Sequence, residues 1–384
     1  MSERLPAVLL DTLRFGGEGE SDLSARWRAT DCSGLAELVA YEGAGIWLFR
    51  RLRATNALES LPPALAELLR QQAFEAAARR MEVEVEAAAV LALLNRAAVP
   101  VILIKGVARS ALADRYPYWD ARATSDVDLL VPADRGAEAD AALRADGYVE
   151  APTLKPADAP RGHHLAPLIK GRIGVELHDS TSSSISADVA WSRAFADSEV
   201  LEWGGQRVRV PPATDLAWNA IGHAMRDMME NPIRGFRLHR LLELAALVNG
   251  GAMIDWDVIR ARALAGEAFD VGESVANPDA VVRLWIGMAL ALVTPEHCPE
   301  GFTVARRELE TLLAGKLAIF RARERFGARF ADRLLAEQAR VLVELPLEPS
   351  PLGASAWGRV RRKLAGRTSR LLLKTWSARH RSPN

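Results

Sequence analysis

The chain contains 384 residues, of which 49% are hydrophobic and 26% charged, and its formal net charge at pH 7 is zero. This composition supplies enough apolar material for more than one hydrophobic core and excludes an intrinsically disordered chain. The two cysteines, Cys32 and Cys298, lie in unrelated contexts, which excludes a disulfide framework. Residues 1–14 lack the uninterrupted apolar core of a signal peptide, and no stretch reaches the roughly 18 apolar residues of a membrane span. We therefore expect a cytoplasmic protein.

The first 98 residues have the composition and spacing of helices. Apolar residues recur at intervals of three and four within Gly34–Arg53 and within the Ala-, Glu- and Arg-rich stretch Pro63–Arg96, which places them on one helix face. Aromatic residues make up only 6% of the chain, and long stretches of strong helix formers favour helix over sheet for most of its length. We predict an N-terminal helical region over residues 1–98.

The spacing changes at Pro100, where short apolar runs typical of strands begin. The predicted strands are Pro100–Ile104, Thr124–Val131, Gly171–His178 and a hairpin over Glu199–Val210 that turns at Gly204-Gly205. The predicted helices between them are Val107–Tyr116 and Arg135–Asp146, the second capped at Asp134 and ended by Gly147. A loop rich in Pro, Asp and Gly, carrying His163 and His164, is predicted over Ala151–Gly171. Together these elements predict an α/β core over residues 99–211.

Helical spacing returns after Pro211. The predicted helices are Ala213–Met229, Ile233–Asn249, Trp256–Ala265, Pro278–Val293 and Val304–Leu345, forming a C-terminal helical domain over residues 212–348. A tail over residues 349–384 follows, and between Arg359 and Asn384 it holds nine Lys or Arg residues and no acidic residue. We expect this basic tail to be an amphipathic end helix that packs on the acidic body, with contact to an anionic partner, nucleic acid or lipid, as the alternative. The predicted fold class is α+β and predominantly helical, with a small mixed sheet between helical segments.

The segment Ser125–Val131 places two carboxylates one residue apart in an apolar strand. Successive strand residues point to opposite faces, so Asp126 and Asp128 project together. Two buried anions side by side repel each other unless a cation lies between them. Glu176, on the third predicted strand, adds a third carboxylate if the two strands are neighbours, and carboxylate oxygens are the ligands that Mg²⁺ prefers. These residues predict a metal site formed by Asp126, Asp128 and Glu176.

Candidate phosphate-binding residues flank this pair. Lys105-Gly106 follows the first strand and opens a helix, where free backbone N–H groups and an ammonium group favour phosphate. Arg122, four residues before Asp126, and Ser125 lie in the loop that enters the metal strand, where both can donate to further phosphate oxygens. The alternatives are an exposed Lys105 at the surface and a Gly106 that serves only the turn.

Arg122 and His178 each have an alternative interpretation. Arg122 has Asp114 and Asp120 as alternative partners for a salt bridge. His178 shares the expected strand face of Glu176, which makes it a candidate partner of the carboxylates or a base at the acceptor site, with a plain polar face as the alternative.

A set of motifs spans roughly residues 98–260. They are the Lys105-Gly106 turn, Arg122-x-x-x-Asp126-x-Asp128-Leu129-Leu130-Val131, Gly147-Tyr148, Val175-Glu176-Leu177-His178, His223 and the helix around Arg237–Leu244. Together they resemble the uncharacterised bacterial nucleotidyltransferase-like proteins of the DNA polymerase beta superfamily. The resemblance implies that Asp126, Asp128 and Glu176 bind two Mg²⁺ ions, with Mn²⁺ as an alternative, and that His223 lies near the carboxylates or the acceptor.

The resemblance also implies an activity. Such an enzyme transfers a nucleoside monophosphate from a nucleoside triphosphate to a hydroxyl or phosphate acceptor and releases pyrophosphate. The association of this subgroup with peptide natural-product clusters makes a modified peptide or a small metabolite the expected acceptor. One feature departs from the superfamily: most members carry Gly-Ser or Gly-Gly closer to the carboxylate pair, whereas Gly106 lies twenty residues before Asp126.

Two other functions are compatible with parts of this pattern. A glycosyltransferase also uses Asp-x-Asp to bind a metal and a nucleotide diphosphate, but it requires several parallel strands before the pair, where this chain has a helical region. A catalytically inactive nucleotide-binding or adaptor protein would use the same fold with the basic tail as a docking segment. The presence of all three carboxylates favours the enzyme.

Overall fold

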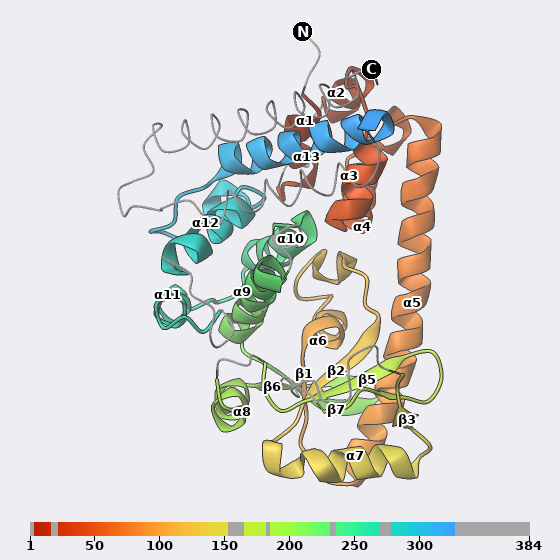
Figure 1. Cartoon of the computed structure of the whole chain (residues 1–384), viewed down its shortest axis with the longest axis vertical. Coiled ribbons are helices and arrows are strands. Elements are labelled where there is room, and N and C mark those ends of the chain that lie inside the picture. Colours follow the sequence, from red (N-terminus) through yellow and green to blue (C-terminus); the bar gives the residue numbers. More distant parts are fainter. Residues whose placement is uncertain are drawn as a thin grey trace, which may run out of the picture.

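A computed structural model describes residues 4–16, 22–152, 165–181, 185–230, 236–268 and 278–326 (Figure 1). Helices make up both ends of the described chain, and the sheet lies between them in sequence, as the fold class predicts. His163, His164 and the basic tail lie outside the described residues.

The N-terminal helices end in one long helix that reaches the sheet. They are α1 (Leu5–Leu13), α2 (Leu23–Arg28), α3 (Leu35–Glu42), α4 (Gly45–Ala54) and α5 (Pro63–Arg96). The predicted helix over Pro63–Arg96 is confirmed as a single helix, which begins at a proline because its first N–H needs no partner inside the helix. The predicted continuous helix over residues 34–53 is wrong, because Gly43 adopts a φ of 63° and ends α3 before α4 begins.

The central sheet has seven strands in the order β3-β4-β5-β2-β1-β7-β6. Its strands are β1 (Ile102–Leu103), β2 (Asp126–Leu130), β3 (Val149–Glu150), β4 (Leu168–Ile169), β5 (Gly174–His178), β6 (Glu199–Trp203) and β7 (Gln206–Val210). The sheet is mixed: β2 pairs with β5 and β1 with β7 in parallel, and the other pairs are antiparallel. The β6–β7 hairpin turns at Gly204 and Gly205 as predicted, and both have the positive φ that this tight turn requires.

The two faces of β2 pack differently. Val127 and Leu129 belong to the main hydrophobic core, together with residues of α5 and of α7 (Gly136–Ala145). On the opposite face Leu130 joins a small separate core against α8 (Ala187–Ala196). Asp126 and Asp128 lie on this second face, beyond the area that α8 covers, so the sheet directs both carboxylates away from the main core.

Several predicted boundaries are wrong. The helix predicted over Val107–Tyr116 is α6 (Lys105–Ala111), which begins at Lys105 and ends five residues earlier than expected. Helix α7 is preceded by a short 3₁₀ helix, Ala133–Arg135, so Asp134 does not cap it. The predicted loop over residues 151–171 contains β4, and α8 was not predicted at all.

The C-terminal helices pack above the sheet and around the N-terminal ones (Figure 1). They are α9 (Ala213–Glu230), α10 (Leu238–Asn249), α11 (Trp256–Leu264), α12 (Pro278–Leu290) and α13 (Arg306–Phe326). The first four predicted helices are confirmed, with α10 beginning later than expected. The helix predicted over Val304–Leu345 is confirmed as far as Phe326, and residues 327–345 lie outside the described residues. Across the described parts of the chain, every helix is too short or too polar to cross a lipid bilayer.

Candidate active site

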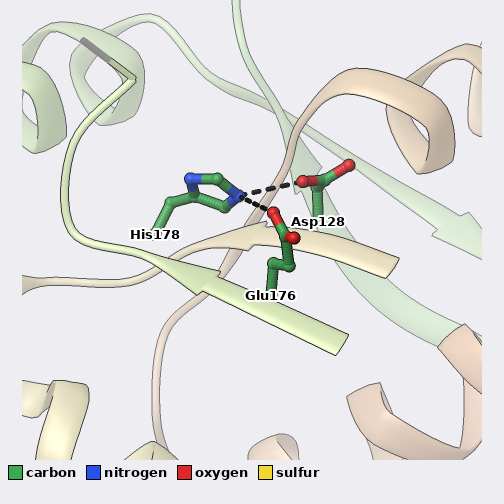
Figure 2. A group of neighbouring side chains, drawn as sticks. All are labelled: Asp128, Glu176 and His178. Atoms are coloured by element: carbon green, nitrogen blue, oxygen red, sulfur yellow. Dashed lines mark hydrogen bonds and ion pairs between the residues drawn. The ribbon is translucent and has the colours of Figure 1, made fainter. Parts of the chain in front are cut away.

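The parallel pairing of β2 with β5 builds the centre of the site. Its register places Asp128 directly opposite Glu176, with Leu130 opposite His178. His178 Nε2 lies 2.9 Å from an oxygen of Asp128 and 3.4 Å from an oxygen of Glu176 (Figure 2). Ligand atoms of these three side chains all lie within 4.8 Å of one another, so they could hold one metal ion. The predicted approach of Glu176 and His178 to the carboxylate strand is confirmed.

Lys105 places a positive charge in the middle of this group. Its Nζ atom lies 2.5 Å from Asp128 Oδ1, 3.7 Å from Glu176 Oε2 and 3.2 Å from His178 Nε2. The residue has a φ of 50°, which a lysine rarely adopts, at the point where β1 ends and α6 begins. The surface alternative for Lys105 is therefore wrong, because its ammonium group pairs with the carboxylates of Asp128 and Glu176.

The pKa values of the carboxyl groups follow from these contacts. Burial raises the pKa of Asp128, but the hydrogen bond from His178 and the charge of Lys105 outweigh it and bring the pKa to about 2. The hydrogen bond from His178 likewise lowers the pKa of Glu176. Both groups are thus carboxylates at neutral pH, as metal ligands must be.

Asp126 shares the strand face but stands apart from the ligand group. Its Oδ1 atom accepts a hydrogen bond of 3.1 Å from Ser125, and it does not belong to the set with mutually close ligand atoms. Burial raises the pKa of Asp126, and the negative charges of Asp128 and Glu176 raise it further. A cation placed between these groups would remove that repulsion.

Gly106 allows α6 to approach the loop before β2. A Cβ atom at this position would lie 2.4 Å from Cγ2 of Thr124, a distance that real Cβ contacts do not show. The glycine therefore allows close packing between the start of α6 and Thr124.

We expect Gly106→Ala to lower the free energy of unfolding by about 1–3 kcal/mol, because the added methyl group overpacks this contact. Thr124→Ser removes the opposing methyl group, so the double variant should recover much of the loss. Urea unfolding of the four proteins in this double-mutant cycle measures the coupling. Strictly additive losses would show that the contact is not the cause.

Arg122 contacts Glu243 on α10 and neither of its predicted acidic partners. Its Nη1 atom donates to Glu243 Oε1 at 2.7 Å, and Arg109 Nη1 donates to the same oxygen at 2.6 Å. Arg240 lies 3.6 Å from the other oxygen of Glu243 and pairs with Asp227 at 2.9 Å. We call these three arginines with Glu243 and Asp227 the arginine cluster.

The arginine cluster adjoins the carboxylate centre. Its members Arg109, Arg240 and Glu243 are buried, and Arg122 and Asp227 are partly buried. Burial lowers the pKa of Arg109 to about 10, and attraction by Glu243 and Asp128 opposes part of that shift. Burial also disfavours the charge of Arg122, but Glu243, Asp227 and Asp126 raise its pKa above the ordinary value. Three positive charges thus face two negative ones within the cluster, so an excess positive charge lies beside Asp126 and Asp128.

His223 lies against this cluster and is not a member of the Asp128, Glu176 and His178 group. Its Nδ1 atom is 3.5 Å from Arg240, and burial, together with the nearby arginines, lowers its pKa well below the ordinary value. The imidazole is therefore neutral, and the geometry gives His223 a polar contact between α9 and α10.

The sequence did not identify Arg109, Arg240 or Glu243 as site residues. Glu243 and Arg109 are separated by 134 residues, so no local motif links them. The available signal was the pair Arg240 and Glu243, charged residues three positions apart in the otherwise apolar helix α10. Charged residues on the buried side of a helix require charged or polar partners, so Arg240 and Glu243 indicate an ionic network around α10.

The donor set fits a divalent cation. Two carboxylates and an adjacent third one supply the oxygen ligands that Mg²⁺ and Mn²⁺ prefer. His178 can act as a nitrogen ligand or hold the Asp128 carboxylate in place through its hydrogen bond.

A small mixed sheet brings carboxylates of adjacent strands together beside the Lys105-Gly106 turn and excess positive charge, an arrangement suited to nucleotidyl transfer. Residues 28–271 match the model of a family described as uncharacterised nucleotidyltransferase. The match covers more than half of the chain, so the chain belongs to this family of nucleotidyl-transferring enzymes. A search of curated proteins and a search of solved structures each found no match.

Proposed function

We propose that the protein is a Mg²⁺-dependent nucleotidyltransferase that transfers a nucleoside monophosphate from a nucleoside triphosphate to an acceptor and releases pyrophosphate. The observation that carries the proposal is the opposition of Asp128 and Glu176 across β2 and β5, with Lys105 between them. The glycosyltransferase alternative requires several parallel strands before the carboxylate pair. Among the described residues, β1 is the only strand before β2, and β1 runs antiparallel to β2, which disfavours this alternative.

Each residue has a role that follows from its position. Asp126, Asp128 and Glu176 would hold the metal, which would neutralise phosphate oxygens and favour ionisation of the attacking hydroxyl. Lys105 leaves its carboxylate partners when a cation binds there and is then free to contact a phosphate oxygen. His178 keeps the Asp128 carboxylate oriented through their 2.9 Å contact.

Arg122 and the other arginines of the arginine cluster offset the negative charge of the α-phosphate, which lies between the acceptor and the departing pyrophosphate. For a hydroxyl acceptor, the oxygen forms a bond to the α-phosphorus while the bond from that phosphorus to the β-phosphate oxygen breaks. The hydroxyl proton passes to Glu176, whose side chain is 26% exposed and therefore accessible to an acceptor.

The position of the label in the product tests this reaction. The full chain is incubated with Mg²⁺, candidate hydroxyl and phosphate acceptors, and ATP labelled at either the α- or the γ-phosphate. Nucleotidyl transfer puts the α-label on the acceptor and the γ-label in pyrophosphate. Transfer of the γ-label to the acceptor would instead show a kinase and overturn the proposal.

A further inference from the structure

A second charged cavity lies between α4, α5 and the short 3₁₀ helix Trp119–Ala121 that precedes Arg122. Its volume is about 330 Å³, at the lower end of the range for small-molecule sites. Five arginines line it, Arg50, Arg53, Arg70, Arg80 and Arg122, and Asp120 is the single acidic residue among the described lining residues. We call this cavity the arginine cleft.

Within the described chain, all the lining arginines except Arg53 have carboxylate partners. Arg70 pairs with Glu59 and Glu67, Arg80 pairs with Glu84, and Arg122 pairs with Glu243. Asp120 accepts two hydrogen bonds from Arg50, at 2.6 and 3.0 Å, and also pairs with Arg80. Arg53 is exposed and has no carboxylate partner among the described residues, and its guanidinium lies 5.6 Å from the centre of the Phe49 ring. A guanidinium that stacks on a ring without a counter-ion is arranged to receive an anion.

The cleft also has an apolar side. Phe49 and Ile46 on α4 and Phe74 on α5 line it, and 75% of the Phe74 side chain is exposed. A large aromatic side chain exposed in the same cleft as the guanidinium of Arg53, which has no carboxylate partner among the described residues, favours a ligand that has both an anionic group and an apolar part.

The position of the cleft connects it to the carboxylate centre. Arg122 lines the cleft and lies four residues before Asp126 on the same segment. On α5, next to Arg80, Arg79 donates to the backbone oxygen of Ser125 at 2.9 Å, which fixes α5 against the start of β2. The cleft therefore lies on the α5 side of Asp126, whereas Lys105 approaches the carboxylates from α6.

We propose that the arginine cleft binds the acceptor substrate, and that this acceptor is a small molecule carrying a phosphate or carboxylate group and an apolar or aromatic portion. The role of the cleft as acceptor site rests on the proposed nucleotidyl transfer. The binding of such an anion to the cleft is independent of that reaction. Phosphate and carboxylate present the same chemistry to guanidinium groups, and the probes below separate them.

Calorimetry on the full chain in the presence of a chelator tests the binding. The probes are phenyl phosphate, benzoate and inorganic phosphate. We expect phenyl phosphate or benzoate to bind more tightly than inorganic phosphate, and Arg53→Gln to weaken that binding at least about tenfold. Phe74→Ser should weaken the aromatic probes and leave inorganic phosphate unchanged. Arg260→Gln, which alters an exposed pair with Asp257 on α11, is the matched control and should change nothing.

Two results would overturn the inference: equal binding of the probes to the wild type and Arg53→Gln, or displacement of the aromatic probe by a non-hydrolysable ATP analogue with Mg²⁺. The second result would assign the cleft to the donor nucleotide. Asp128→Asn should retain probe binding, because that binding needs no metal. If the protein transfers no nucleotide but binds the probes in an Arg53-dependent way, the proposed reaction is contradicted and the anion site is still supported.

Discussion

Asp128→Asn is expected to reduce nucleotide transfer by at least about 10²–10³-fold, the usual effect of removing one group that stabilises charge at a reacting centre. Asp128 contacts both Lys105 and His178 and lies opposite Glu176, so its charge organises the whole centre. Asparagine keeps the size of the side chain and removes the charge. Initial rates with α-labelled nucleotide at saturating Mg²⁺ measure the loss.

The matched control is Asp146→Asn, which neutralises an exposed aspartate that pairs with Lys170 at 2.6 Å. This variant should transfer nucleotide at the wild-type rate. If Asp128→Asn remained within twofold of the wild type, the carboxylate on β2 could not be the centre of the reaction.

Glu243→Gln is expected to lower the free energy of unfolding by about 3–5 kcal/mol, the usual cost of removing one partner of a buried ion pair. Glu243 accepts hydrogen bonds from Arg109 and Arg122, and its side chain is only 4% exposed. Without its charge, the buried arginines repel one another. Urea unfolding at pH 7 measures the difference, and Glu199→Gln, which weakens an exposed pair with Arg115, should cost about 0–1 kcal/mol.

The loss of stability in Glu243→Gln is expected to depend on pH. Burial raises the pKa of Glu243, but Arg122, Arg109 and Arg240 outweigh it and hold the pKa far below the ordinary 4.5. A carboxyl whose pKa is lowered in the folded protein stabilises the fold fully at pH values above its pKa in the unfolded chain. That stabilisation is lost as the pH falls from there toward the pKa in the folded protein. The stability difference between the wild type and Glu243→Gln should therefore be constant above pH 5 and shrink below about 4.5. A difference that grew toward low pH would show that Glu243 is protonated in the folded protein.

Local patterns predicted the strands of the site, because alternation is a property of neighbouring residues. Asp126 and Asp128 lie on one face of β2, and Glu176 and His178 on one face of β5, as their spacing requires. The parallel register that sets Asp128 opposite Glu176 joins residues 48 positions apart along the chain and had to be assumed. The family resemblance supplied that assumption, and the structure bears it out.

Charged contacts between distant elements could not be predicted. Arg122 had nearer acidic residues in sequence, yet it pairs with Glu243 because α10 packs against the 3₁₀ helix before Arg122. Helix α8 was missed although Ala190, Trp191, Ala194 and Phe195 recur at helical spacing, so the signal for this helix was present in the sequence. Gly43 interrupts a stretch of otherwise helical spacing with a positive φ, and a Cβ atom at this position would lie 2.8 Å from Nδ1 of His239 on the distant helix α10.

Binding of Mn²⁺, measured by electron paramagnetic resonance with a non-hydrolysable ATP analogue present, tests the central claim most directly. The claim is that the carboxylates of β2 and β5 form a metal-assisted nucleotidyl-transfer centre. The wild type should bind Mn²⁺, and Asp128→Asn and Glu176→Gln should each weaken that binding at least tenfold, while Asp146→Asn leaves it unchanged. Wild-type affinity for Mn²⁺ in both Asp128→Asn and Glu176→Gln would contradict the account.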